Sequence, residues 1–345
     1  MAQVYRVGII GCSPMAIGSS ARARSGNRPA PAHSHVDGYR DDPRTEIVSV
    51  CDLDPAALDR YREFWGDGVA TYSSSDEMLA REDLDLVSIV TPDNRHHQIF
   101  AAAADSGVQG ILCEKPIATS LEDAQFIIDA THRTRVKTLI NHSRRFDTRW
   151  RAPLADVASG AIGSIHHVIG MLGSPRAMLF RNGTHLVNTL LWFIQSEPIW
   201  VQAAFADADQ HYGSGYHGDG GRNPDLEPAA VAIIGFADGS RAVFNANKQI
   251  PYTFEVNVYG STGSLTMKSD AADWTLQAEG IGRVHRTTPA AIDSKPAISN
   301  VIDDLIEMVE TDGDPIPGLV SARTSLAILL AITDSASSNG LRVFL

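Results

Sequence analysis

The stretch that decides the fold opens the chain: Val4-Tyr5-Arg6-Val7-Gly8-Ile9-Ile10, a β-branched run, passes into Gly11-Cys12-Ser13-Pro14-Met15-Ala16. A strand that ends at a glycine and leads into a helix is how dinucleotide-binding folds approach a pyrophosphate. The segment matches the glycine fingerprint at its first position, Gly11, and at its last, Ala16. Ser13 replaces the glycine of closest approach, so we expect the phosphates slightly farther away or bonded by its hydroxyl. Taken alone, the segment also fits an ordinary strand-to-loop turn. The residues of this turn predicted to contact a cofactor are Gly11, Ser13, Met15 and Ala16.

A second predicted strand, Ile47–Cys51, ends directly before Asp52. An acidic residue at this place accepts hydrogen bonds from the ribose hydroxyls of NAD and repels the extra phosphate of NADP. The usual gap from the glycine turn is about twenty residues. Here the gap is longer by roughly the length of a loop, Ile17–Ala32, which we interpret as an insertion. The alternative for an aspartate in this segment is a structural role in a solvated turn. We assign the cofactor role to Asp52 and the structural role to Asp54. We therefore predict NAD, with NADP less favoured. The arginines of the insertion that would accept an NADP phosphate are Arg22, Arg24 and Arg28.

Residues 1–143 alternate short β-branched runs with helical stretches, the pattern of a parallel sheet with covering helices. Ser120, followed by Asp123, resembles the aspartate form of a capping box. We predict an α/β fold whose N-terminal domain is a doubly wound, Rossmann-type parallel sheet. The expected strands are Val4–Ile10, Ile47–Cys51, Leu86–Val90, Gly110–Cys113 and Thr138–Asn141, and the expected helices are Ala56–Phe64, His96–Ala104 and Leu121–Thr131.

Residues 144–345 have a different pattern, because strand-like segments follow one another with few helices between them. Asp238-Gly239 is a hairpin turn signal, and Gly260–Gly263 supplies another. We predict a substrate-binding and oligomerisation domain with a large open, mainly antiparallel sheet, and we expect the final helices and strand to be able to pack back on the first domain. The expected strands are Ser164–Met171, Val201–Ala206, Ala229–Phe236, Arg241–Asn247, Phe254–Tyr259, Ser264–Met267 and Leu341–Leu345, and the expected helices are Leu186–Ile194, Asn300–Glu310 and Leu319–Ser337.

Composition narrows the function classes. With 345 residues the chain exceeds the usual span of one core, which favours two domains. The net charge of -12 repels phosphate backbones and anionic membrane surfaces, so we expect neither nucleic-acid nor membrane partners. Cys12, Cys51 and Cys113 each close an apolar run without metal-ligand spacing, which favours buried free thiols in a reducing cytoplasm. We expect no signal peptide and no membrane-spanning stretch, since the longest apolar run is around Leu326–Ile332.

Three further segments are Thr91-Pro92-Asp93-Asn94-Arg95-His96, Glu114-Lys115-Pro116 and Gly183-Thr184-His185. They resemble, in this order and spacing, the Thr-Pro-Asn-x-x-His, Glu-Lys-Pro and Gly-x-His segments of the glucose-fructose oxidoreductase, inositol dehydrogenase and rhizopine-catabolism superfamily, often written Gfo/Idh/MocA. Tyr259–Gly263 resembles a turn of that family, and the likeness covers nearly the whole chain. The resemblance implies a dehydrogenase with a Rossmann domain, NAD and a small polyhydroxylated substrate.

The resemblance assigns the catalytic roles to Lys115 and His185. Lys115 ends a parallel strand, where open α/β sheets bind ligands, and by resemblance it reaches the nicotinamide and orients the substrate hydroxyl. His185 would remove the hydroxyl proton, because imidazole titrates near neutral pH. The alternatives are a lysine that points to water and a histidine that caps the helix it begins. Thr184 is expected beside the substrate. His96 is expected at the cofactor, and a purely structural support of the cofactor loop is an equally good alternative. The other residues that the resemblance places at the cofactor are Thr91, Pro92, Asn94 and Glu114.

One position departs from the family pattern. The family usually has an aspartate four residues before the histidine, whereas this chain has Arg181. A carboxylate would stabilise the charged imidazole and a guanidinium would do the opposite, so the change bears on proton transfer. An Arg181 that faces the site favours an anionic substrate such as a sugar acid; the alternative is an outward arginine paired with a surface acid. Arg144 and Arg145, at the domain junction, are expected either to touch substrate or to form salt bridges.

A glycine-rich stretch carries four side chains that we interpret as a candidate lid over the pocket. They are His211, Tyr212, Tyr216 and His217. We expect no metal, because no ligand spacing supports one.

Together these observations predict an NAD-dependent oxidoreductase that moves a hydride between the nicotinamide and a secondary alcohol or ketone of a sugar, cyclitol or sugar acid. Two other classes stay open: a redox-assisted lyase or glycosidase that regenerates NAD, and a non-catalytic NAD(P)-binding sensor, which Arg181 favours. An exposed apolar sheet face needs cover, which favours self-association, and the resemblance implies a homodimer or homotetramer formed through the C-terminal sheet.

Overall fold

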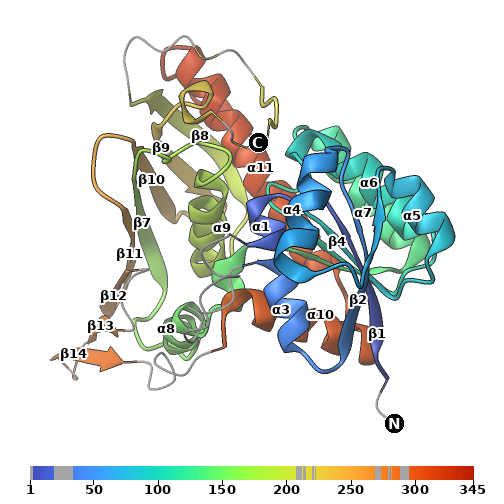
Figure 1. Ribbon diagram of the computed structural model, residues 1–345. Coiled ribbons are helices and arrows are strands. Elements are labelled where there is room, and N and C mark those ends of the chain that lie inside the picture. The colour runs from blue at the N-terminus through green and yellow to red at the C-terminus, as the bar shows by residue number, and fades with distance from the viewer. Residues whose placement is uncertain are drawn as a thin grey trace. The chain divides into compact units, whose positions relative to one another are not determined.

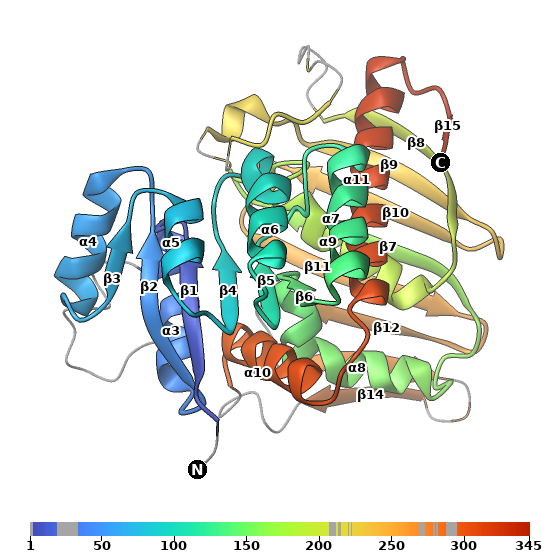
Figure 2. The same cartoon turned by 90° about the vertical axis from the view of Figure 1, so that its right-hand side faces the viewer.

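The chain forms two compact units, which Figure 1 and Figure 2 draw as ribbons. Unit 1 comprises Met1–Ser143 and Lys295–Val320, and unit 2 comprises Arg144–Ser294 and Ser321–Leu345. The computed structural model describes residues 3–18, 34–206, 212, 215–219, 221, 223–268, 273–278, 280, 282–287 and 295–345.

Unit 1 is built on a six-stranded parallel sheet with the order β3-β2-β1-β4-β5-β6 in the described part of the chain. The order reverses between β1 and β4, and ligands of open α/β sheets bind at the carboxyl ends of the strands at such a reversal. Val7, Ile9 and Ile89 are completely buried, as expected for strands covered on both faces. The strands are β1 (Tyr5–Ile10), β2 (Thr45–Cys51), β3 (Ala70–Tyr72), β4 (Leu86–Ile89), β5 (Gly110–Cys113) and β6 (Lys137–Ile140).

Helices cover both faces of this sheet. α5, α6 and α7 contact one another in succession, and α3 and α10 pack together (Figure 2). Right-handed crossovers that leave the centre of the sheet in opposite directions place α3 and α6 on opposite faces. Ser120 Oγ accepts the Asp123 N–H at the start of α7, as the sequence predicted. The helices of unit 1 are α1 (Pro14–Ile17), α3 (His35–Asp41), α4 (Pro55–Trp65), α5 (Ser75–Arg81), α6 (His96–Asp105), α7 (Leu121–Thr134) and α10 (Ala297–Glu310), with a 3-10 turn η1 (Asp93–Arg95).

Unit 2 is built on a nine-stranded sheet with the order β14-β13-β12-β11-β7-β10-β9-β8-β15 among the described residues. All neighbours are antiparallel except β7 and β10, which confirms the predicted mainly antiparallel sheet. The final strand, β15, pairs with β8 at the edge of this sheet rather than with the first sheet. The strands are β7 (Ile165–Gly173), β8 (Pro198–Phe205), β9 (Ala230–Phe236), β10 (Arg241–Asn247), β11 (Thr253–Gly260), β12 (Gly263–Lys268), β13 (Asp273–Ala278), β14 (Gly282–Thr287) and β15 (Val343–Phe344).

Local chemistry explains two features of this sheet. Asp238 Oδ1 accepts the N–H and the hydroxyl of Ser240, and Gly239 has a φ of 90°, so the predicted Asp238-Gly239 hairpin joins β9 to β10. α9 (Gly183–Ile194) lies against β7. A Cβ on Gly170 would lie 2.6 Å from Leu186 Cδ1, so the leucine side chain would have to shift to admit a larger residue there. The other helical segments outside unit 1 are α8 (Thr148–Ala158) and the 3-10 turn η3 (Pro224–Leu226), while η2 (Ser143–Phe146) and α11 (Ile316–Ser337) span the unit boundaries.

Helix α11 is long and apolar enough to cross a membrane by length and composition, which the sequence analysis did not anticipate. Half of its most apolar window is buried inside the protein, as in the core helix of a globular domain. In the described part of the chain it is the only helix with this property, and one such helix is weak evidence for a membrane span.

The three cysteines are free and buried, as the sequence predicted. Burial raises the pKa of Cys12 to about 12 and that of Cys51 to about 12, with the nearby Asp52 carboxylate as the second cause. These thiols therefore stay protonated at neutral pH and are poor nucleophiles.

Candidate functional site

The turn after β1 approaches β4 closely. Gly11 has a φ of 99°, and a Cβ there would lie 2.6 Å from the Val90 carbonyl oxygen, so the position requires glycine. Ser13 precedes the short helix α1, in which Met15 is 41% exposed and Ala16 is buried. The predicted insertion lies outside the described residues except for Ile17 and Gly18, and so do Arg22, Arg24 and Arg28.

Asp52 ties the end of β2 to this turn. Its Oδ2 accepts the Cys12 N–H at 2.7 Å, and its Oδ1 accepts the Asp54 N–H at 2.9 Å. A carboxylate has about four acceptor positions, so each oxygen keeps one for another donor such as a ribose hydroxyl. Asp54 accepts the Ala56 N–H and caps α4, which confirms the structural role predicted for it.

The Thr91–His96 segment follows β4. Thr91 Oγ1 is buried and has no hydrogen-bond partner among the described residues, whereas Asn94 is exposed and Pro92 is half-buried. His96 is completely buried; its Nε2 lies 3.2 Å from the Thr91 carbonyl oxygen and its Nδ1 lies 3.0 Å from the Pro116 carbonyl oxygen. The imidazole therefore links two of the segments singled out in the sequence. These contacts fit a structural support, and the alternative place of His96 at the cofactor stays a prediction.

Glu114-Lys115-Pro116 follows β5 at the carboxyl edge of the parallel sheet. Glu114 and Lys115 are 2% and 7% exposed. Glu114 Oε1 accepts from Asn141 Nδ2 at 2.7 Å and lies 3.0 Å from His35 Nε2, while Oε2 accepts the Lys115 N–H at 3.4 Å. Sequence reasoning missed His35 and Asn141. Their available signals were the Ser34–Asp37 capping box, which the structure shows complete, and an asparagine at the end of a predicted strand.

The described groups at the strand ends of unit 1 fit a dinucleotide. Gly11 leaves space for a close backbone approach, Asp52 has spare acceptor positions, and Thr91 Oγ1 is a buried hydroxyl without a partner in the described chain. Buried polar atoms normally have a partner, so an unpaired hydroxyl at this edge is suited to a ligand.

His185 lies in the first turn of α9 in unit 2. Its N–H donates to the Asn182 carbonyl at 3.1 Å, and the neighbouring Thr184 is buried. The turn before the helix is held by a buried carboxylate, since Glu227 Oε2 accepts the N–H groups of Phe180 and Arg181 at 2.7 and 3.0 Å. A carboxylate thus contacts the main chain of the residue that stands where the family usually has an aspartate.

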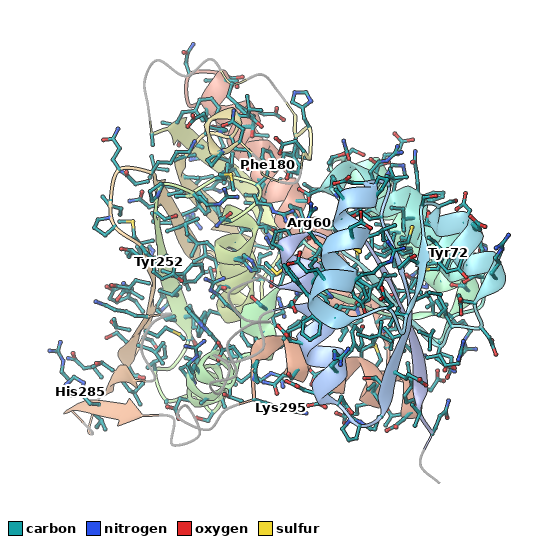
Figure 3. The ribbon with its side chains drawn as sticks, in the orientation of Figure 1. Arg60, Tyr72, Phe180, Tyr252, His285 and Lys295 are labelled. Carbon is teal, nitrogen blue, oxygen red and sulfur yellow. The ribbon has the colours of Figure 1, made fainter. Side chains whose placement is uncertain are left out.

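Arg181 itself is half-buried, and its alkyl chain lies against Gly221, where a Cβ would come within 2.9 Å of Arg181 Cγ. Phe180, labelled in Figure 3, stacks on Tyr216 with ring centroids 4.2 Å apart. Of the predicted lid residues, Tyr216 is therefore packed, His217 is exposed, and His211 lies outside the described residues. Burial raises the pKa of Tyr212, the fourth of them, to about 12.

Arg144 and Arg145 are half-buried, and desolvation lowers the pKa of each to about 10. The Arg144 guanidinium lies over the Phe254 ring, 3.4 Å from its centroid. Arg145 donates to Asn188 Oδ1 at 2.6 Å and to Ser321 Oγ at 2.8 Å. Asn188 is three residues after His185 on α9, so the partners of Arg145 lie on that helix and on α11, whereas Arg144 packs among aromatic rings.

Among the described residues, no group of three or more His, Cys, Asp or Glu side chains could hold a metal ion.

Two family models match the chain. Residues 5–142 match the oxidoreductase family with an NAD-binding Rossmann fold, and residues 154–266 match the GFO/IDH/MocA C-terminal domain. Inositol 2-dehydrogenase of Rhizobium meliloti is 27% identical over 309 residues, which cover 84% of this chain and 88% of that protein. The rhizopine catabolism protein MocA of Rhizobium meliloti is also 27% identical, over 63% of this chain and 68% of its own length.

Solved structures show the same fold. The oxidoreductase domain protein from Kribbella flavida has a TM-score of 0.80 at 19% identity and covers 100% of this chain and 99% of its own. Scyllo-inositol dehydrogenase from Lactobacillus casei, solved with NAD(H) and scyllo-inositol, has a TM-score of 0.76 at 18% identity and covers 99% of both chains. Because the two family models together span most of the sequence, the resemblance predicted from its motifs is confirmed: the chain belongs to the Gfo/Idh/MocA family of oxidoreductases and carries its NAD-binding Rossmann domain.

Proposed function

We propose that the protein is an NAD-dependent dehydrogenase that oxidises a secondary alcohol of a sugar, cyclitol or sugar acid, or reduces the corresponding ketone. The observation that carries the proposal is the placement of Lys115. It follows β5 at the ligand-binding edge of a Rossmann sheet, with its main chain bonded to the Glu114 carboxylate, in a chain that matches an oxidoreductase family in both parts.

Gly11, Asp52 and Thr91 are the residues that would hold the dinucleotide, which supplies the hydride acceptor when bound. Lys115 is buried directly after β5, and its main-chain N–H donates to the Glu114 carboxylate. We assign its ammonium to the substrate hydroxyl, where it favours the developing alkoxide. His185 is assigned the hydroxyl proton. The alcohol carbon thus loses a hydride and the oxygen loses a proton, and a ketone results.

NAD is the proposed cofactor and NADP the less favoured one. Asp52 supports this preference, since both its oxygens already accept main-chain N–H groups and keep the carboxylate at the end of β2. The 2′-phosphate of NADP would meet a fixed negative charge there.

The proposed substrate is a small polyol, and Arg181 decides between neutral and acidic ones. The similarity to inositol 2-dehydrogenase, which matches 84% of the chain, supports a neutral cyclitol as the substrate. A guanidinium close to the start of α9 favours a carboxylated substrate. We keep the neutral polyol first, because the match to inositol 2-dehydrogenase spans most of the chain, whereas the acidic substrate is argued from a single residue.

Two copies of the chain are proposed to associate through the outer face of the unit 2 sheet. Ile169 of β7 is 39% exposed, and Val231 and Ile233 of β9 are 41% and 45% exposed. β10 lies between these two strands, and its Val243 is in register with both Ile169 and Ile233. A contiguous apolar sheet face of this kind is a liability in a monomer.

The test is a screen of NAD and NADP reduction against sugars, uronic acids, inositols and amino sugars. We expect NADH to accumulate with at least one polyol. Product without accumulated NADH would identify a redox-assisted lyase or glycosidase instead. NADH binding without any turnover across the screen would identify the sensor class.

A further inference from the structure

Four buried polar side chains of unit 1 are joined by hydrogen bonds into a set that ends at Glu114, the residue before Lys115. The proposed reaction assigns no role to the other three. His35, Tyr39 and Ser88 are completely buried, and Glu114 is 2% exposed. His35 and Tyr39 lie one turn apart on α3, Ser88 lies within β4, and Glu114 follows β5. Buried polar groups are costly unless each has a partner, so the partners of this set define what it does.

The hydrogen bonds of the set fix the imidazole of His35. Tyr39 Oη lies 2.9 Å from Ser88 Oγ, which lies 3.1 Å from His35 Nδ1. His35 Nε2 lies 3.0 Å from Glu114 Oε1. A carboxylate only accepts, so Nε2 carries a proton and donates to Glu114. The imidazole is therefore held between Ser88 on one side and Glu114 on the other.

Glu114 passes this restraint to Lys115. Asn141 Nδ2 donates to the same Oε1 at 2.7 Å, so His35 and Asn141 hold one oxygen of the carboxylate. The other oxygen, Oε2, accepts the Lys115 N–H at 3.4 Å. On the other side of Lys115, the Pro116 carbonyl oxygen lies 3.0 Å from His96 Nδ1. The residues before and after Lys115 are thus each hydrogen-bonded to a buried histidine, Glu114 to His35 and Pro116 to His96.

Close packing of this region does not require polar side chains at positions 35 and 88. The strand reads Leu86-Val87-Ser88-Ile89, and the other three residues are apolar and completely buried. Apolar side chains at positions 35 and 88 would fill the same space, and such replacements of buried polar networks are often neutral or stabilising. We therefore interpret the network as a means of orienting the Glu114 carboxylate, which in turn accepts the main-chain N–H of Lys115.

We propose that His35 is a positioning residue for Lys115 and acts through the Glu114 carboxylate; the inference rests on the proposed function, in which Lys115 orients the substrate hydroxyl. Loss of the His35 donor removes the hydrogen bond that holds Glu114 Oε1 and lets the carboxylate shift. The hydrogen bond from the Lys115 N–H to Oε2 is then weakened, and the main chain that carries the lysine side chain is held less firmly.

Selective [15N]lysine labelling tests this without a substrate, because the five lysines of the chain give five main-chain amide signals. The Lys115 signal is identified by its absence in Lys115→Arg. In His35→Leu we expect the Lys115 amide proton to move upfield and to exchange at least about tenfold faster, while the other four signals stay in place. His35→Gln keeps a donor for Glu114 and an acceptor for Ser88, and it should restore the wild-type signal.

Tyr39→Phe is the matched control. It removes a buried hydroxyl from the far end of the set and lowers stability, but it leaves the contact between His35 and Glu114 intact. We expect the Lys115 signal and the turnover of Tyr39→Phe to match the wild type.

Kinetics supply the second readout. We expect His35→Leu to lower kcat at least about tenfold with an NADH Kd within about threefold of wild type, since misplaced catalytic groups cost rate rather than affinity. His35→Gln should recover most of the rate. An unmoved Lys115 signal in His35→Leu, an equal movement in Tyr39→Phe, or a moved signal with unchanged kcat each overturns the proposal. A wild-type protein without turnover counts against the proposed function alone, because the labelling experiment needs no substrate.

Discussion

Replacing Asp52 with Asn should relax the preference for NADH over NADPH at a small cost in stability. The two carboxylate oxygens accept different N–H groups, those of Cys12 and Asp54, and Asn has a single acceptor oxygen. Cys12 is buried, so the amide oxygen should keep its N–H and release the exposed Asp54 N–H to water. The loss of one such hydrogen bond predicts a decrease of about 1 kcal/mol in the free energy of unfolding.

The effect on cofactor choice follows from the removed charge. Two unit charges about 4 Å apart repel by about 4 kcal/mol at an effective dielectric constant of about 20. Asp52 is half-exposed, so solvent screening reduces this. We expect about a third of this repulsion to remain, which is roughly 1.4 kcal/mol. Its loss in Asp52→Asn corresponds to about a tenfold change in the ratio of the NADH and NADPH dissociation constants.

Fluorescence titration with NADH and NADPH measures that ratio, and urea denaturation measures the stability. Asp54→Asn is the control, because Asp54 is 59% exposed and caps α4 without contact to the turn after β1. It should leave the ratio unchanged. An unchanged ratio in Asp52→Asn would refute the assignment of Asp52 to the ribose of NAD. A wild-type preference for NADPH would indicate that its phosphate is bound by Arg22, Arg24 and Arg28.

Lys115→Ala and His185→Ala should each lower turnover at least about a hundredfold while NADH affinity stays largely intact. Steady-state kinetics and calorimetry check this, and near-normal turnover of His185→Ala would assign the proton to another group. Arg181→Ala should raise the KM for uronic acids far more than for neutral inositols if the guanidinium binds a carboxylate. Equal changes in both would leave Arg181 a structural residue. Ile233→Asp should convert the oligomer to monomers in light scattering, because it places a charge in the exposed apolar face of the sheet. A wild-type protein that is already monomeric would contradict the proposed association.

The sequence was sufficient for the parts of the fold that have strong local signals. The Rossmann strands, the Ser120 cap and the Asp238-Gly239 turn depend on β-branched runs and short-range hydrogen bonds, which can be read along the chain. β3 (Ala70–Tyr72) was missed because three residues are too short to show a period. α8 was missed because Pro153 lies inside it. β13 and β14 were also missed.

The candidate site was predictable where a motif names the residue, and not where contacts join distant segments. Glu114 and Lys115 are adjacent in a motif, but His35 meets Glu114 across 79 positions and Asn141 meets it across 27. Glu227 reaches the turn before α9 from 46 positions beyond Arg181. Such partners are brought together by sheet order and loop paths, which local patterns do not specify.

The central claim is that a hydride passes from a polyol carbon to NAD. The most direct measurement uses a polyol that is turned over in the screen, carrying deuterium on the carbon that is oxidised, and analyses the reduced cofactor by mass spectrometry. We predict that one deuterium per molecule appears in NADH and that the transfer disappears in Lys115→Ala. Unlabelled NADH, or deuterium lost to water, would contradict the account.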